Sequence, residues 1–179
     1  EEFVQDEDRR LAYADHPLPI GHGQTISQPY IVALMTQLLA LKPEHRVLEV
    51  GCGSGYQAAI LSRLVAEVYS VEIIAALADA AAARLRRLGY TNVHVRQGDG
   101  YFGWKEHAPF DAIIVTAAAP HTPPPLLEQL AENGRMVIPV GATGAYQTLW
   151  LHEKVAGKLQ SQPITSVVFV PLTGGHRQP

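Results

Sequence analysis

The fold of this chain is decided by one stretch, Arg46-Val47-Leu48-Glu49-Val50-Gly51-Cys52-Gly53-Ser54-Gly55-Tyr56. A β-rich apolar run ends there in three alternating glycines, and an alanine-rich helical pattern follows, so the stretch predicts a strand, a tight turn and a helix. The glycines leave out Cβ atoms where the backbone turns sharply and where a ligand approaches the main chain. The helix points free N–H groups at that ligand. A bare turn would need only one glycine, so the stretch predicts a ligand site.

Beyond this stretch, strand and helix patterns alternate along the chain. Strands are expected at 46–50, 67–71, 93–97, 110–116 and 135–140, with helices at 58–64, 74–88 and 126–130. The fourth run is almost wholly apolar, as expected for a strand buried on both faces of a parallel sheet. Residues 147–155 and 159–170, joined by a turn, predict an antiparallel pair. The sequence therefore predicts an α/β fold with a doubly wound, mostly parallel, Rossmann-like sheet and an antiparallel C-terminal edge.

The segment ahead of the first strand has a different character. Residues 1–15 are charged and predict a short peripheral helix, whereas the prolines and glycines in 16–26 predict a loop with a defined course. A helical pattern follows Ser27 and ends at Lys42-Pro43.

Composition narrows the classes of function. The 179 residues carry a net charge of −3 without a run of lysine or arginine, which argues against nucleic acid as the main partner. Cys52 is the single cysteine, so no disulfide framework is expected. No apolar run is long enough to span a bilayer and no signal peptide is evident, so we expect a cytoplasmic protein with no membrane partner. The histidines are scattered, and no metal site is expected.

Polar and glycine clusters follow four of the predicted strands. Residues 51–55, Glu72, Asp99 and 116–120 should converge at the carboxyl edge of the sheet, where open α/β folds bind ligands. Glu72 lies about twenty residues beyond the glycines, where an acid accepts hydrogen bonds from a ribose. Asp99 offers acceptor oxygens to the exocyclic amine of an adenine. These positions predict a nucleoside cofactor.

Two details favour S-adenosyl-L-methionine over a dinucleotide. The dinucleotide fingerprint places its third glycine three residues after the second, and Tyr56 occupies that position here. Glu49 stands two residues before the first glycine, where a carboxylate repels a pyrophosphate but attracts an ammonium and a sulfonium.

The sequence lacks a motif for methylating amines, and this absence narrows the class of methyl acceptor. The chain continues from Thr116 through three alanines to Pro120, without the Asn/Asp-Pro-Pro-aromatic tetrad that orients an exocyclic amine, so methylation of nucleic-acid bases is disfavoured. A loop without a strong base, residues 23–29, is the best remaining candidate for the acceptor site.

Four stretches resemble the protein-L-isoaspartate O-methyltransferases, a protein-repair family with a class I S-adenosylmethionine-dependent methyltransferase fold. They are Gly21-His22-Gly23-Gln24-Thr25-Ile26-Ser27-Gln28-Pro29-Tyr30, Glu49-Val50-Gly51-Cys52-Gly53-Ser54-Gly55-Tyr56-Gln57, Phe110-Asp111-Ala112-Ile113-Ile114-Val115-Thr116-Ala117-Ala118 and Val168-Phe169-Val170-Pro171-Leu172. The resemblance implies one methyltransferase domain over residues 1–179. Within it we expect a substrate-side segment and helix in 1–45, a cofactor-binding core in 46–140, and antiparallel strands and tail in 141–179.

The resemblance also implies the reaction. Family members methylate the side-chain carboxylate of L-isoaspartyl residues in damaged peptides and proteins, and S-adenosyl-L-homocysteine is the product. A carboxyl group with a pKa of about 4 is already ionised near neutrality, so no general base is needed. Ser27 matches the family's active-site serine and would orient the carboxylate. Its place before Pro29 also allows a plain helix N-cap, a role compatible with the first. The expected cofactor-binding residues are Thr25, Ile26, Ser27, Glu49, Gly51, Gly53, Gly55, Glu72, Asp99, Gly100 and Thr173.

Two other functions are compatible with the same residues. One is methylation of a small carboxylic acid, and the other is binding of the cofactor or of isoaspartyl chains without catalysis. We expect the chain to be a monomer.

Overall fold

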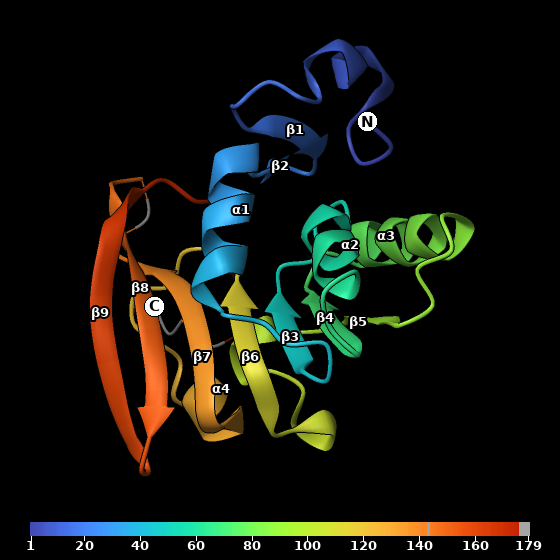
Figure 1. Cartoon of the computed structure of the whole chain (residues 1–179). Helices are drawn as coiled ribbons and strands as arrows, with labels where there is room; N and C mark the ends of the chain where they lie inside the picture. Colours follow the sequence, from blue (N-terminus) through green and yellow to red (C-terminus); the bar gives the residue numbers. More distant parts are fainter. Residues whose placement is uncertain (143, 176–179) are drawn as a thin grey trace.

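The centre of the fold is a seven-stranded sheet in the order β5-β4-β3-β6-β7-β8-β9 (Figure 1). The computed structural model describes residues 1–142 and 144–175. Neighbouring strands from β5 to β7 run parallel, while β8 runs antiparallel to both β7 and β9. The strands are β3 (Arg46–Val50), β4 (Glu67–Glu72), β5 (Val93–Gln97), β6 (Phe110–Val115), β7 (Leu130–Val140), β8 (Gln147–Val155) and β9 (Lys158–Val167). The predicted parallel sheet with an antiparallel edge is confirmed.

Helices cover both faces of this sheet. They are α1 (Pro29–Leu38), α2 (Tyr56–Ser62), α3 (Ala75–Arg87) and α4 (Pro124–Gln129). A hydrophobic core lies on each face of the sheet. Alternate residues of β3 pack in different cores because strand side chains point to opposite faces. Val47 packs with Met35, Leu61 and Leu85 from the first three helices. Leu48 packs in a second core with Leu126 of α4. The fold is therefore doubly wound, as predicted.

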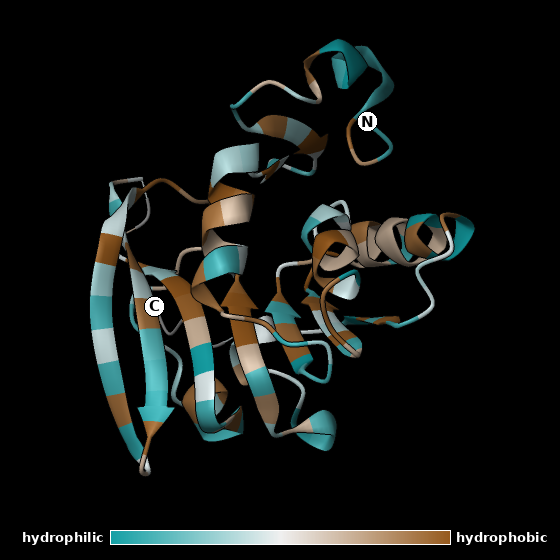
Figure 2. Ribbon diagram, viewed as in Figure 1, coloured by the Kyte–Doolittle hydropathy of each residue, from teal (hydrophilic) through white to brown (hydrophobic). Residues whose placement is uncertain are grey.

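Hydropathy separates the buried middle of the sheet from its edge. Figure 2 shows hydrophobic residues concentrated in β3 and β6 and a largely hydrophilic outer strand, β9. The central strands lie between two helical layers, whereas most residues of β9 are exposed. In the part of the chain that the structure describes, no helix is both long and apolar enough to cross a bilayer.

The N-terminal segment corrects one prediction. Residues 16–26 were expected to form a loop, but β1 (Leu18–Gly21) and β2 (Gln24–Ile26) form an antiparallel hairpin. Gly21, His22 and Gly23 all have positive φ and make its tight turn. The loop prediction was wrong because these residues build a turn that pairs two strands. A 3-10 helix, η1 (Asp6–Leu11), precedes the hairpin, which lies beside the start of α1 (Figure 1).

The last strand ends earlier than predicted. β9 stops at Val167, and the chain then turns across the carboxyl edge of β6 instead of continuing to residue 170. The Ala118 amide donates to the Val170 carbonyl, and the Leu172 amide donates to the Ala118 carbonyl, each at 2.8 Å. These bonds fix residues 170–173 above the strand ends, where they can cover a ligand.

Candidate functional site

The glycine loop between β3 and α2 adopts a backbone that other residues avoid. Gly51, Gly53 and Gly55 have φ values of 97°, 53° and 88°, all in the left-handed region. The Gly51 amide donates to the Val71 carbonyl at 2.9 Å, which ties the loop to β4. Gly55 serves packing instead, because a Cβ there would lie 3.2 Å from Leu85 of α3.

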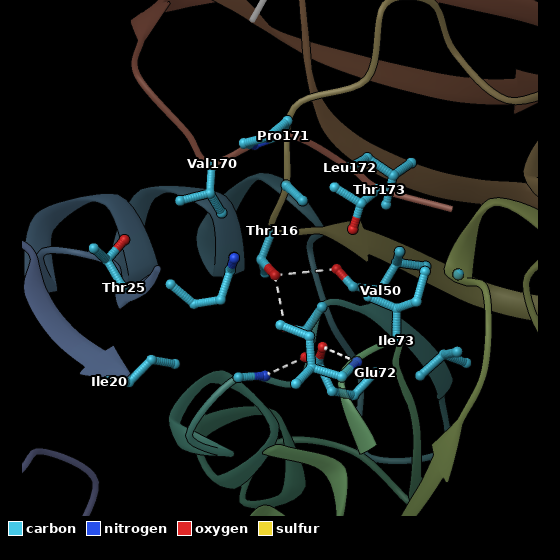
Figure 3. Close-up of a pocket in the computed structure, with 17 residues that line it drawn as sticks. Ile20, Thr25, Val50, Glu72, Ile73, Thr116, Val170, Pro171, Leu172 and Thr173 are labelled. Atoms are coloured by element: carbon cyan, nitrogen blue, oxygen red, sulfur yellow. Dashed lines mark hydrogen bonds between the residues drawn. The ribbon is translucent and has the colours of Figure 1, made fainter. Parts of the chain in front are cut away.

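Two adjoining cavities open above this loop at the carboxyl edge of the sheet. The inner cavity, of about 540 Å³, lies between the strand ends and the covering residues 170–173 (Figure 3). The second cavity, of about 420 Å³, extends toward α1. The expected residues on the inner wall are Thr25, Gly51, Gly53, Glu72, Gly100 and Thr173, and those on the second are Thr25, Ile26, Ser27, Gly51 and Gly53. The structure thus brings most of the predicted cofactor residues together.

Glu72 joins the glycine loop to the end of β4. One carboxylate oxygen accepts a hydrogen bond from the Gly53 amide at 2.8 Å, and the other accepts one from the Ile74 amide at 3.0 Å. Each oxygen retains a lone pair that can accept a further hydrogen bond, for example from a ribose hydroxyl. Figure 3 shows Glu72 across the cavity from Val170 and Thr173.

Thr116 connects the same loop to β6. Its hydroxyl lies 3.0 Å from the Val50 carbonyl and 2.7 Å from the Gly51 carbonyl, and donates its hydrogen between them. Thr116 lines both cavities, whereas the expected convergence of residues 116–120 extends only as far as Ala117. Its place at the end of β6 was the signal that located it.

Asp99 and Gly100 follow β5 but have different surroundings. A Cβ on Gly100 would overlap Val50, so only glycine lets this turn approach the strand end closely. The Asp99 carboxylate accepts hydrogen bonds from the Tyr101 and Gly175 amides, each at 3.0 Å, and does not line either cavity. Contact between Asp99 and an adenine stays a prediction, while a role in capping the following turn is evident.

Glu49 lies beneath the loop and lines neither cavity. It is two residues after Val47 and faces the same side of the sheet, which the helices cover, so its exposed fraction is 0%. Ser70 of β4 donates a hydrogen bond to Oε2, while Oε1 has no partner among the described residues. Burial raises the pKa of Glu49 to about 8, although the Ser70 hydrogen bond opposes this shift. The expected attraction of an ammonium and a sulfonium to this carboxylate stays a prediction, and any contact would have to pass through the loop above it.

Ser27 lies where the second cavity meets an open groove. Gln28 is the N-cap of α1 and Pro29 occupies its first turn, so the alternative that Ser27 caps this helix is wrong. Among the described residues, none forms a hydrogen bond with the Ser27 hydroxyl. The hydroxyl therefore stays available to a ligand.

The open groove has a volume of about 1070 Å³ and runs between α1 and the residues around the end of β9. It shares Thr25, Ser27 and Thr116 with the cavities, so groove and cavities form one continuous site. Sequence reasoning missed its outer wall, which includes Tyr30, Tyr146 and Val168. Exposed apolar residues outside a periodic pattern gave no signal that they share a surface.

The site can be compared with known proteins. The family model described as "Protein-L-isoaspartate(D-aspartate) O-methyltransferase (PCMT)" matches residues 1–177. "Protein-L-isoaspartate O-methyltransferase 2" of Syntrophobacter fumaroxidans is 64% identical over 176 residues, covering 98% of this chain and 71% of the relative. The protein of the same name from Polaromonas sp. is 60% identical over 174 residues, which cover 97% of this chain and 82% of the relative.

Solved structures agree with this assignment. A protein-L-isoaspartate O-methyltransferase superposes with a TM-score of 0.88 at 32% identity, covering 97% of this chain, which spans 58% of the solved chain. A putative family member from Plasmodium falciparum, in complex with S-adenosyl-L-homocysteine, has a TM-score of 0.80 at 29% identity and covers 96% of this chain and 84% of its own. These findings confirm the resemblance, and the glycine cradle and the paired oxygens of Glu72 fit such a nucleoside cofactor. The chain belongs to the protein-L-isoaspartate(D-aspartate) O-methyltransferase family, whose members are methyltransferases that use S-adenosyl-L-methionine.

Proposed function

We propose that this chain transfers a methyl group from S-adenosyl-L-methionine to the side-chain carboxylate of L-isoaspartyl residues in peptides and damaged proteins. The observation that carries the proposal is the position of Ser27, which lines both the second cavity and the open groove. The groove extends from Ser27 past α1 to Tyr146 and Val168 and is open to solvent, which favours a peptide over a small free acid as the acceptor.

For this reaction the protein has mainly to align the acceptor carboxylate with the methyl group. The bound cofactor supplies an activated methyl group on a sulfonium. An acceptor carboxylate oxygen forms the new bond to carbon while the carbon–sulfur bond breaks, and the electron pair of that bond stays on sulfur. The acceptor is ionised at neutral pH, so no proton has to be removed. The Ser27 hydroxyl would donate a hydrogen bond that holds the carboxylate in line.

The surroundings of Ser27 support a mechanism without a general base. Of the described residues that line the groove, none is Asp, Glu, Lys, Arg or His. Burial raises the pKa of the Cys52 thiol in the second cavity, so this thiol is neutral and not a nucleophile. We propose that Thr25, Ile26 and the glycine loop hold the cofactor, together with Glu72, Gly100 and Thr173.

The proposed acceptor is tested with twin peptides. One peptide carries a single L-isoaspartyl residue and the other carries normal aspartate at the same position, and incorporation of labelled methyl is measured at equal concentrations. We expect labelling of the isoaspartyl peptide only. Equal labelling of both twins, or preferred labelling of a small free carboxylic acid, would contradict the proposal. Cofactor binding by calorimetry without turnover would instead support a binding protein.

Ser27→Ala tests the proposed orienting role. We expect kcat/KM for the isoaspartyl peptide to fall about 30-fold, since a hydrogen bond to a charged group contributes roughly 2 kcal/mol. Affinity for S-adenosyl-L-homocysteine, measured by calorimetry, should change less than about threefold, because the backbone of the glycine loop is untouched. Ser166→Ala is the matched control, because Ser166 lines the groove but neither cavity. Equal losses in both variants would refute a specific role for Ser27.

A further inference from the structure

The outer wall of the groove is apolar and unusually exposed. Tyr30, Tyr146 and Val168 are 58%, 80% and 70% exposed, and all three line the groove. They come from different parts of the chain: α1, the segment before β8, and the segment after β9. Large apolar side chains that gather at one opening without mutual burial mark a surface for an apolar ligand group.

The charges around the groove also favour an apolar ligand group. The described lining of the groove carries no acidic or basic side chain, so no opposite charge there offsets the desolvation of a charged group at the outer wall. A negative charge lies beside it at Asp15, whose two carboxylate oxygens accept hydrogen bonds from the Tyr30 amide at 2.9 Å and from the Gln28 side-chain amide at 3.5 Å. An acidic ligand group beside Tyr30 would meet this carboxylate and be repelled, while an apolar group would gain contact with the ring.

We infer that Tyr30, Tyr146 and Val168 form an apolar subsite for the residues that flank the isoaspartyl residue. The chain then selects among damaged sites, and it favours those with aromatic or large aliphatic neighbours over those with acidic neighbours. This inference rests on the proposed function, which puts the acceptor carboxylate beside Ser27 at the inner end of the groove.

The selection is measured with three isoaspartyl peptides that differ only in their flanking residues. Both neighbours of the isoaspartyl residue are Phe in the first peptide, Ala in the second and Glu in the third. KM and kcat are measured at saturating cofactor. We expect KM of the Phe peptide to lie at least about tenfold below that of the Glu peptide, the size of a typical aromatic contact. Equal KM values for the three peptides would overturn the inference.

Variants locate the subsite. Tyr146→Ala and Tyr30→Ala should each raise KM for the Phe peptide about fivefold to tenfold, with much smaller changes for the Glu peptide, whereas Tyr146→Phe should keep the preference. Tyr13→Ala is the matched control, because Tyr13 is 81% exposed but does not line the groove. A uniform rise of KM for all peptides would contradict a selective subsite.

Failure of the proposed function gives a different result from failure of this inference. If no peptide is methylated, binding of the three peptides is measured by calorimetry in the presence of S-adenosyl-L-homocysteine. Tighter binding of the Phe peptide would uphold the subsite without the reaction. Equal binding would overturn the subsite, whatever the outcome for the reaction.

Discussion

Replacing Gly51 with alanine is expected to lower the free energy of unfolding by about 4 kcal/mol, the sum of backbone strain and a steric clash. Gly51 has a φ of 97°, which costs an L-residue about 1–2 kcal/mol. The added Cβ would also overlap the Thr116 hydroxyl, so Thr116 must leave the carbonyls of Val50 and Gly51. Because Gly51 and Thr116 line both cavities, we further expect cofactor affinity to fall more than about 100-fold.

The effect of the clash is separated from backbone strain by two matched comparisons. Gly89→Ala introduces the same strain at a φ of 80°, but a Cβ there would meet nothing within 4 Å, so it should cost only about 1 kcal/mol. Thr116→Ala should destabilise the wild type by about 1 kcal/mol yet add almost nothing to Gly51→Ala, because the clashing hydroxyl is gone. Urea unfolding of wild type, Gly51→Ala, Thr116→Ala and the double variant measures the coupling energy between positions 51 and 116. Strict additivity would contradict the clash.

Glu49→Gln is expected to stabilise the protein at high pH. The pKa of Glu49 is about 8 in the folded protein, whereas the ordinary value for a glutamate is 4.5. The pKa is raised mainly because the carboxyl is buried. Between these values the folded state keeps a proton that the unfolded chain has lost, so this group's contribution to stability falls as pH rises. The loss is about 3 kcal/mol between pH 5 and pH 8, because the slope reaches its full value of roughly 1.4 kcal/mol per pH unit only in the middle of this range. Glutamine carries no charge at either pH and escapes this loss.

The comparison is made by urea unfolding of wild type and Glu49→Gln at pH 5, 6, 7 and 8. The free energy of unfolding of Glu49→Gln minus that of wild type should rise steadily with pH and level off above about pH 8. Titration of other groups cancels in the difference, including that of His152, whose pKa is lowered by burial. A difference that is constant over this range would show that Glu49 is ionised in the folded protein.

The order of strands and helices could be predicted from the sequence because each depends on local patterns. The glycine spacing fixed a left-handed turn at the end of β3, and the apolar run of β6 marked a strand buried on both faces. Strand ends in a parallel sheet share one edge, so Glu72 and Thr116 were correctly expected to lie together, whereas Asp99, expected there by the same argument, lines neither cavity. The hairpin at 18–26 was missed because the same glycines and prolines serve loops and tight turns alike.

The sequence by itself determined the architecture and the glycine loop, whereas the tertiary structure decided which side chains face a ligand. Val47, Leu48 and Val50 are all apolar because both faces of β3 are buried, so hydropathy could not reveal that Glu49 points beneath the loop. The groove beside Ser27 joins α1 to residues more than a hundred positions later. Such a surface exists only once the chain has folded, because its members share no local period, and their proximity depends on how β8 and β9 pair.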